Sequence, residues 1–108
     1  MELKLIETKK LNNNKILTRE LYEIGDYKVE VDTYENGYVN LCTKQKRIVE
    51  YLPSIYSLYD FNKEVLNGFD ISTTSYGKIM GVDDIREMIK AYEQAIEVVE
   101  ILTEKFIK

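Results

Sequence analysis

The 108-residue chain contains no histidine and no tryptophan, and it has a single cysteine and a single proline. Histidine is the commonest general base, the usual partner of a serine or cysteine nucleophile and the commonest transition-metal ligand, so its absence excludes most hydrolase triads and most transition-metal centres. The lone Cys42 cannot form an intramolecular disulfide, and the sequence has no cysteine–histidine cluster to bind zinc. We therefore expect no metal site, no cofactor and no disulfide framework.

Long apolar runs and an excess of basic charge are also missing. No segment approaches the roughly 18 apolar residues that cross a bilayer, and Met1–Glu7 carries acid where a secretion signal has a basic and then an apolar stretch. The net charge is −4; residues 55–108 hold ten acidic and six basic side chains, against nine and nine in residues 1–54. We expect a cytoplasmic protein without a membrane anchor, and no direct binding to nucleic acid.

The clearest strand signal is Tyr27–Tyr34. Its side chains alternate with period two, so that Val29 and Val31 fall on one face and charged residues fall on the other. Asn36 and Gly37 follow directly, and both tolerate the positive φ that a type I′ turn demands. We therefore expect a half-buried strand followed by a tight hairpin.

Further segments extend the expected sheet. Residues 1–52 as a whole predict a β-meander, whose last strand, over residues 47–52, ends at Pro53 because proline cannot donate to a ladder. Residues 53–68 have no clear period and are expected to form a loop or a short helix. Alternation returns in residues 69–80, which predict one more strand.

The apolar period then changes to that of an α-helix, which we expect over residues 83–107 with Asp83 or Asp84 as N-cap. The side chains expected to face the core are Ile85, Met88, Ile89, Tyr92, Ala95, Ile96, Val99, Thr103 and Phe106. Packing this helix on the meander predicts one α+β domain over residues 1–108, with an antiparallel sheet of four to six strands and one long C-terminal helix.

Four glutamates of this helix lie within an arc of about 60°, at 100° per residue, with no basic residue between them. They are Glu93, Glu97, Glu100 and Glu104. One interpretation is a solvated face whose repulsion is screened by water, and the other is a strip that docks on a basic surface of another protein. These glutamates are candidate partner-binding residues.

A second apolar group lies away from the expected core stripe of the helix. It comprises Val98, Ile101 and Leu102, and Ile101 lies beside the acidic arc. Either the core wraps round the last turns, or these residues contact a partner or a second copy of the chain, because an apolar patch on a small protein is usually covered. Ile101 is therefore a candidate contact residue, and a homodimer is an alternative to a different partner.

Nine tyrosines are a high number for this length. Most are expected in the core or on the sheet, with their hydroxyls reaching water. Tyr34 and Tyr38 flank the Asn36-Gly37 turn, where exposed rings suit a protein interface. These two tyrosines are further candidate partner-binding residues.

Acid–base chemistry without histidine would need paired carboxylates. Glu30 and Asp32 share a strand face, but Lys28 shares it too, and the sequence places no third oxygen ligand for a metal. Cys42, within an apolar strand, is expected to be a small buried hydrophobe. We therefore do not expect an enzyme.

Lysine outnumbers arginine twelve to three, and isoleucine, asparagine and tyrosine are abundant, as AT-rich codons produce, so we expect a bacterial or phage origin. The chain resembles the small acidic phage-encoded inhibitors of bacterial defence systems, the anti-CRISPR proteins among them. The resemblance lies in its size, in this amino-acid bias, and in a β-meander around residues 34–38 that is joined to an acidic helix over residues 93–104. The resemblance implies a non-catalytic inhibitor of a nuclease complex with a basic nucleic-acid-binding groove, the four glutamates standing for phosphates. The alternative is a small homodimeric structural, assembly or ligand-binding protein that uses the C-terminal helix.

Overall fold

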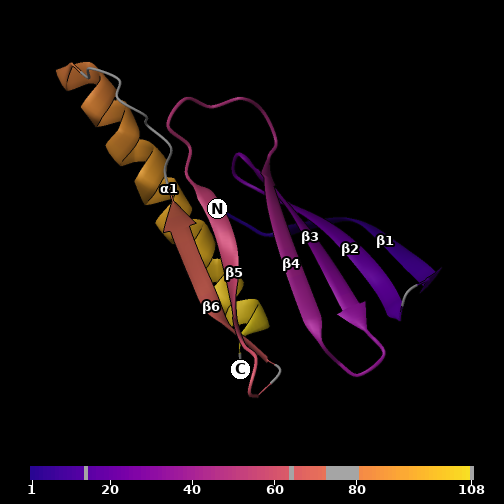
Figure 1. The fold of residues 1–108 in the computed structure, drawn as a ribbon. Coiled ribbons are helices and arrows are strands. Elements are labelled where there is room, and N and C mark those ends of the chain that lie inside the picture. The colour runs from indigo at the N-terminus through magenta and orange to yellow at the C-terminus, as the bar shows by residue number, and fades with distance from the viewer. Residues whose placement is uncertain (14, 64, 73–80, 108) are drawn as a thin grey trace.

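The computed structural model describes residues 1–13, 15–63, 65–72 and 81–107. Its elements are β1 (Lys4–Asn13), β2 (Ile16–Ile24), β3 (Tyr27–Tyr34), β4 (Val39–Gln45), β5 (Ser54–Asp60), β6 (Val65–Ser72) and α1 (Val82–Phe106). β1 to β4 form an antiparallel four-stranded sheet in sequence order, and β5 and β6 form a separate antiparallel hairpin (Figure 1). The α+β class and the antiparallel meander are confirmed.

Hydroxyl groups join the hairpin to the sheet where β5 lies beside β4 (Figure 1). Thr43 Oγ1 donates to the carbonyl of Ile55 at 2.7 Å, and Ser57 Oγ donates to the carbonyl of Leu41 at 2.8 Å. The hydroxyl of Tyr59 donates to a further β4 carbonyl. Side-chain donors thus connect two strands that belong to separate sheets.

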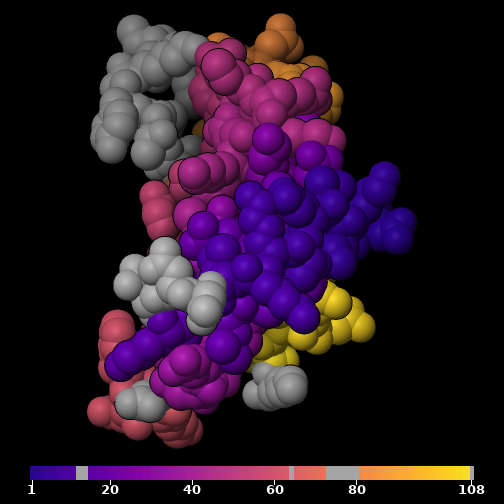
Figure 2. All heavy atoms as spheres, turned by 90° about the vertical axis from the view of Figure 1, so that its right-hand side faces the viewer, coloured from indigo at the N-terminus to yellow at the C-terminus, as the bar shows by residue number. Residues whose placement is uncertain are grey.

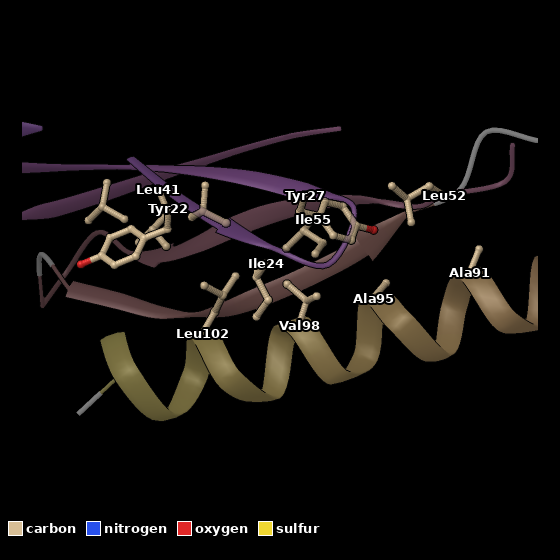
Figure 3. Packing of buried hydrophobic residues seen from close by; sticks show 12 residues of the cluster. Tyr22, Ile24, Tyr27, Leu41, Leu52, Ile55, Ala91, Ala95, Val98 and Leu102 are labelled. Atoms are coloured by element: carbon tan, nitrogen blue, oxygen red, sulfur yellow. The ribbon is translucent and has the colours of Figure 1, made fainter. Parts of the chain in front are cut away.

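The core lies between one face of the four-stranded sheet, the hairpin and α1 (Figure 3). The register pairs Tyr22 with Val29 and Val31 with Leu41, so these side chains point to the same face. The helix buries a seam of small and medium-sized side chains, which we call the packing seam: Ala91, Ala95, Val98 and Leu102. The remaining buried apolar residues are Tyr22, Ile24, Tyr27, Val29, Val31, Leu41, Leu52 and Ile55.

The outer strand β1 lies across the face shown in Figure 2. Its pairing with β2 is irregular between Leu5 and Glu7 and again between Lys10 and Asn13. Breaks in register and lysines on an edge strand both discourage pairing with another chain. The open edge of β1 is therefore poorly suited to association.

Two predictions for the middle of the chain are wrong. Residues 47–52 form part of a connection instead of a strand, and Pro53 precedes β5, where its missing N–H costs no ladder bond. The carbonyl of Pro53 also accepts a hydrogen bond from the buried hydroxyl of Tyr27 at 2.5 Å. The loop or short helix expected over residues 53–68 is likewise wrong, because β5 and the first half of β6 occupy it.

Turn chemistry explains the hairpin that the sequence did not reveal. The Asp60 carboxylate accepts the backbone N–H of Asn62 at 3.0 Å and that of Lys63 at 3.2 Å, which closes the turn between β5 and β6. The strand predicted over residues 69–80 begins earlier, at Val65, and its part from residue 73 onward lies outside the described residues.

Two smaller predictions for the first hairpins also need correction. Gly37 has φ of +84°, but Asn36 does not have positive φ, so the turn is not type I′. Gly37 N–H donates to the Tyr34 carbonyl at 3.0 Å instead, as in three-residue hairpin loops with glycine in the left-handed position. Cys42 is exposed, because it is paired with Glu30 on the open face of the sheet.

The helix begins one residue earlier than predicted, and only part of the expected core stripe packs inward: Ala95 is buried, and Val99 and Phe106 are partly buried against the core. Gly81 is the N-cap, and the Asp84 carboxylate accepts its backbone N–H at 3.1 Å. Ile85 and Ile89 of the expected core stripe are 42% and 50% exposed, whereas Val98 and Leu102 of the expected outer patch are 0% exposed. The packing seam contains alanines, and alanine lets a helix approach a sheet more closely than isoleucine does.

Leu102→Ala should therefore destabilise the protein far more than Ile89→Ala. Leu102 is fully buried, so its truncation leaves a cavity and should cost about 2–5 kcal/mol. Ile89 is half exposed, and its truncation in dilute protein should cost under about 1 kcal/mol. Urea unfolding followed by circular dichroism measures both. Equal losses would contradict the assignment of the packing seam.

Candidate protein-binding surface

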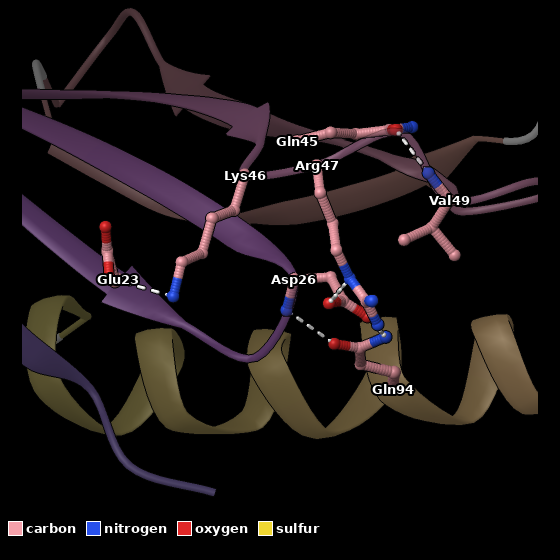
Figure 4. Close-up of polar contacts among 7 residues, drawn as sticks. All are labelled: Glu23, Asp26, Gln45, Lys46, Arg47, Val49 and Gln94. Carbon is pink, nitrogen blue, oxygen red and sulfur yellow. Dashed lines mark hydrogen bonds and ion pairs between the residues drawn. The ribbon is translucent and has the colours of Figure 1, made fainter.

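The β2–β3 turn fixes the rotation of α1 about its axis (Figure 4). The backbone N–H of Asp26 donates to Gln94 Oε1 at 2.8 Å, and Gln94 Nε2 donates back to Asp26 Oδ2 at 3.0 Å. Arg47 Nε donates to Asp26 Oδ1 at 2.7 Å. Gly25 has φ of +54°, which favours glycine, and a Cβ there would push Gln94 Oε1 away from this contact. With Gln94 held against the sheet, the opposite side of α1 is left to solvent.

All four glutamates predicted as partner-binding residues are exposed on α1. Glu97 lies 3.8 Å from the amino group of Met1, and its side chain is 51% exposed. Among the residues that the structure describes, this is the only ion pair that the four glutamates form. The acidic stripe of Glu93, Glu97, Glu100 and Glu104 is therefore largely unneutralised.

The apolar patch predicted beside the acidic stripe is divided by the fold. Val98 and Leu102 belong to the packing seam, and Ile101 is partly buried against the same core. The core thus wraps round the last turns of α1, which was one of the two interpretations of this patch. Ile101 keeps a partly exposed edge next to the glutamates.

The structure brings Tyr34 and Tyr38 together at the β3–β4 turn. Their rings meet edge to face at 5.8 Å and 73°, and Tyr38 stacks on Tyr59 at 5.1 Å and 19°. Burial raises the pKa of Tyr59 to about 12. Sequence reasoning considered Tyr59 for an interface but did not predict its contact with Tyr38, because nothing in its own segment shows that β5 lies beside β4.

The tyrosine cluster borders an open hollow of about 380 Å³ at the C-terminal end of α1. Tyr38, Leu66 and Phe106 give it apolar walls, and Lys63 and Asn67 are among its polar lining residues. Its volume lies near the lower end of the range for small-molecule sites. The cluster and the acidic stripe are separate surfaces, since the glutamates do not line this hollow.

The two strand carboxylates considered for catalysis hold an arginine between them. Arg19 Nε and Nη2 donate to the two oxygens of Asp32 at 2.7 and 3.0 Å, and Arg19 Nε lies 3.2 Å from Glu30. The hydrogen bonds to Asp32 raise the pKa of Arg19, which stays charged. Asp32 is 7% exposed and is occupied by this bidentate contact. The cluster therefore serves to satisfy a buried carboxylate.

Sequence reasoning also missed an apolar strip on α1. Ile85, Ile89 and Ile96 are 42%, 50% and 47% exposed, although their spacing suggested a core face. The signal was present in the sequence as two parallel apolar stripes, of which only one can face the strands. The exposed strip runs beside the acidic stripe.

The described residues show neither a metal site nor a membrane-spanning helix, and comparisons with known proteins identify no relative. Among the described residues, no three His, Cys, Asp or Glu side chains are grouped so that they could hold a metal ion. Within that same part of the chain, no helix is both long and apolar enough to cross a membrane. The chain matches no protein-family model, and comparisons with curated proteins and with solved structures find no match either.

Asp26→Asn should cost stability at neutral pH but not in acid. Hydrogen bonding from Arg47, and then from Gln94, lowers the pKa of Asp26. The charged form therefore stabilises the fold above the unfolded-state pKa of about 3.9, and this contribution is lost as pH falls through the lower folded-state pKa. The effect should be small, because the Arg47 side chain is 73% exposed.

Urea midpoints measured from about pH 7 down to about pH 2 check this linkage. The wild type should unfold at higher urea than the variant at pH 7, and the gap should close in acid. A gap that stays constant over this pH range would show that Asp26 acts by its shape and not by its charge.

Proposed function

We propose that this chain is a non-catalytic protein-binding module that acts through the outward side of α1. The exposure of Glu93, Glu97, Glu100 and Glu104 in one largely unneutralised stripe carries the proposal. Like charges at helical spacing repel and do not stabilise the fold. A basic surface on a partner relieves this repulsion and is drawn to the stripe from a distance.

The spacing of the glutamates suits a partner that ordinarily binds nucleic acid. At 1.5 Å per residue, successive glutamates rise by about 6, 4.5 and 6 Å along the helix. Alternate phosphates of one B-form strand rise by about 7 Å, which is comparable. The stripe can therefore occupy a groove whose lysines and arginines are placed for phosphates.

The target that we propose is a nuclease complex of a bacterial defence system of the CRISPR type. The small size, the excess of lysine over arginine and the acidic helix, in which the chain resembles phage-encoded inhibitors, support this choice, and so does the phosphate-like rise of the stripe. On this proposal a phage or another mobile element encodes the chain, and binding blocks the groove that the target nucleic acid would enter.

Replacing the four glutamates of the stripe with glutamine should weaken binding at least about tenfold. Immobilised wild-type chain should capture the nuclease complex from a nuclease-treated lysate of a low-GC bacterium that carries such a system. Capture should fall as salt rises to about 0.5 M, because screening shortens the reach of the charges. The purified chain should also inhibit DNA cleavage by the captured complex, and the quadruple variant should lose at least about tenfold in inhibition.

A matched control separates the stripe from net charge. Glu2, Glu7, Glu35 and Glu87 are exposed, and changing all four to glutamine alters the charge by the same amount. This control should inhibit as the wild type does. The proposed function would be refuted if the wild type and the stripe variant inhibit equally. It would also be refuted if neither salt nor added competitor DNA reduces capture of the nuclease complex.

A further inference from the structure

α1 carries a second apolar seam beside the packing seam. Its members are Ile85, Ile89, Tyr92, Ile96, Val99 and Thr103, spaced four, three, four, three and four residues apart. This is the spacing of the facing positions in a coiled coil. Ile85, Ile89 and Ile96 are 42%, 50% and 47% exposed, so the N-terminal part of this open seam is about half exposed. An apolar strip on a small protein is usually covered by a partner.

The open seam is also accessible to another helix. The first turns of α1 extend past the strands at the upper left of Figure 1, and no residue of α1 before Ala91 is buried. The strands cover the C-terminal part of the helix instead. The described strands therefore leave the first turns of α1 open to a second helix.

The charged residues beside the open seam indicate which helix can pack on it. One flank is formed by residues that recur every seven positions, namely Arg86, Glu93 and Glu100, while the other flank faces the core. In an antiparallel helix pair, equivalent flanks of the two helices meet. Arg86 of one copy then lies against Glu93 of the other, and the reciprocal contact gives two ion pairs of opposite charge.

We propose that two copies of this chain associate through the open seam as an antiparallel helix pair. With the two-fold axis between Lys90 and Ala91, Ile85 packs on Ile96 of the other copy and Ile89 on its Tyr92. The strand-covered parts of the two copies then lie at opposite ends of the pair. This inference does not rest on the proposed function, because it is argued from the exposed isoleucines of the open seam and from Arg86. The pairing uses Glu93 of the acidic stripe and leaves Glu97 and Glu104 outside the flank.

Sedimentation equilibrium from about 1 µM to about 1 mM tests the pairing. The interface is small, so the mass of the wild type should rise reversibly with concentration from 12.7 kDa towards twice that value. Ile89→Asn should remove this rise. Ile6→Asn is the matched control, because Ile6 is a similarly exposed isoleucine, at 46%, on β1, and it should dimerise as the wild type does.

Charge reversal tests the antiparallel register. Arg86→Glu and Glu93→Arg should each be monomeric at concentrations where the wild type is a dimer, since each places like charges in both reciprocal contacts. An equimolar mixture of the two variants should recover the dimeric mass, because both contacts again join opposite charges. Both positions are exposed, and unchanged urea unfolding of each variant verifies the fold.

Three results would overturn the proposal: a wild type that stays monomeric up to about 1 mM, single charge variants that dimerise as the wild type does, or a mixture that stays monomeric. Each of these is distinct from failure of the proposed function, which is read from nuclease inhibition and not from mass. A wild type that inhibits but never dimerises would refute the pairing alone.

Discussion

The contact between the packing seam of α1 and the strands is the interaction on which the rest of the structure depends. A two-stranded hairpin is marginally stable by itself, and the hairpin of β5 and β6 has no strand pairing with the four-stranded sheet. Ala91 to Leu102 pack at once against Ile24 and Tyr27 of the meander and Ile55 of the hairpin (Figure 3). The helix therefore joins the four-stranded sheet and the hairpin in one hydrophobic core. The Asp26–Gln94 contact fixes which side of the helix packs in that core.

The acidic and apolar surfaces of α1 follow from this choice of side. A helix that buries a narrow seam of alanine, valine and leucine leaves most of its circumference free, and here the free part holds both the acidic stripe and the open seam. The stripe suits attraction at a distance, and the open seam suits close packing after contact. One side of α1 therefore packs in the core, while the acidic stripe and the open seam lie side by side on the rest of its surface.

The sequence predicted the parts of the fold that have a clear local period. Alternation in Tyr27–Tyr34 and the helical period after residue 82 were sufficient for the meander, the long helix and the α+β class, and the arc of the glutamates placed them on one exposed side. The side of α1 that packs could not be predicted, because two apolar seams with the same spacing compete and hydropathy favours the larger isoleucines. The strand β5 and the contact of Tyr38 with Tyr59 depend on long-range pairing, which local patterns do not contain.

The hydroxyl bridges between β4 and β5 have a consequence for motion. A backbone ladder ties every second residue of two strands, whereas Thr43, Ser57 and Tyr59 each hold a single point. Such a boundary opens when a few independent contacts break, so amide hydrogens beside it should exchange with solvent through local opening. Amide hydrogens inside β2 and β3 should exchange only on global unfolding. The slowest exchange is therefore expected within the meander, and faster exchange along the boundary between β4 and β5.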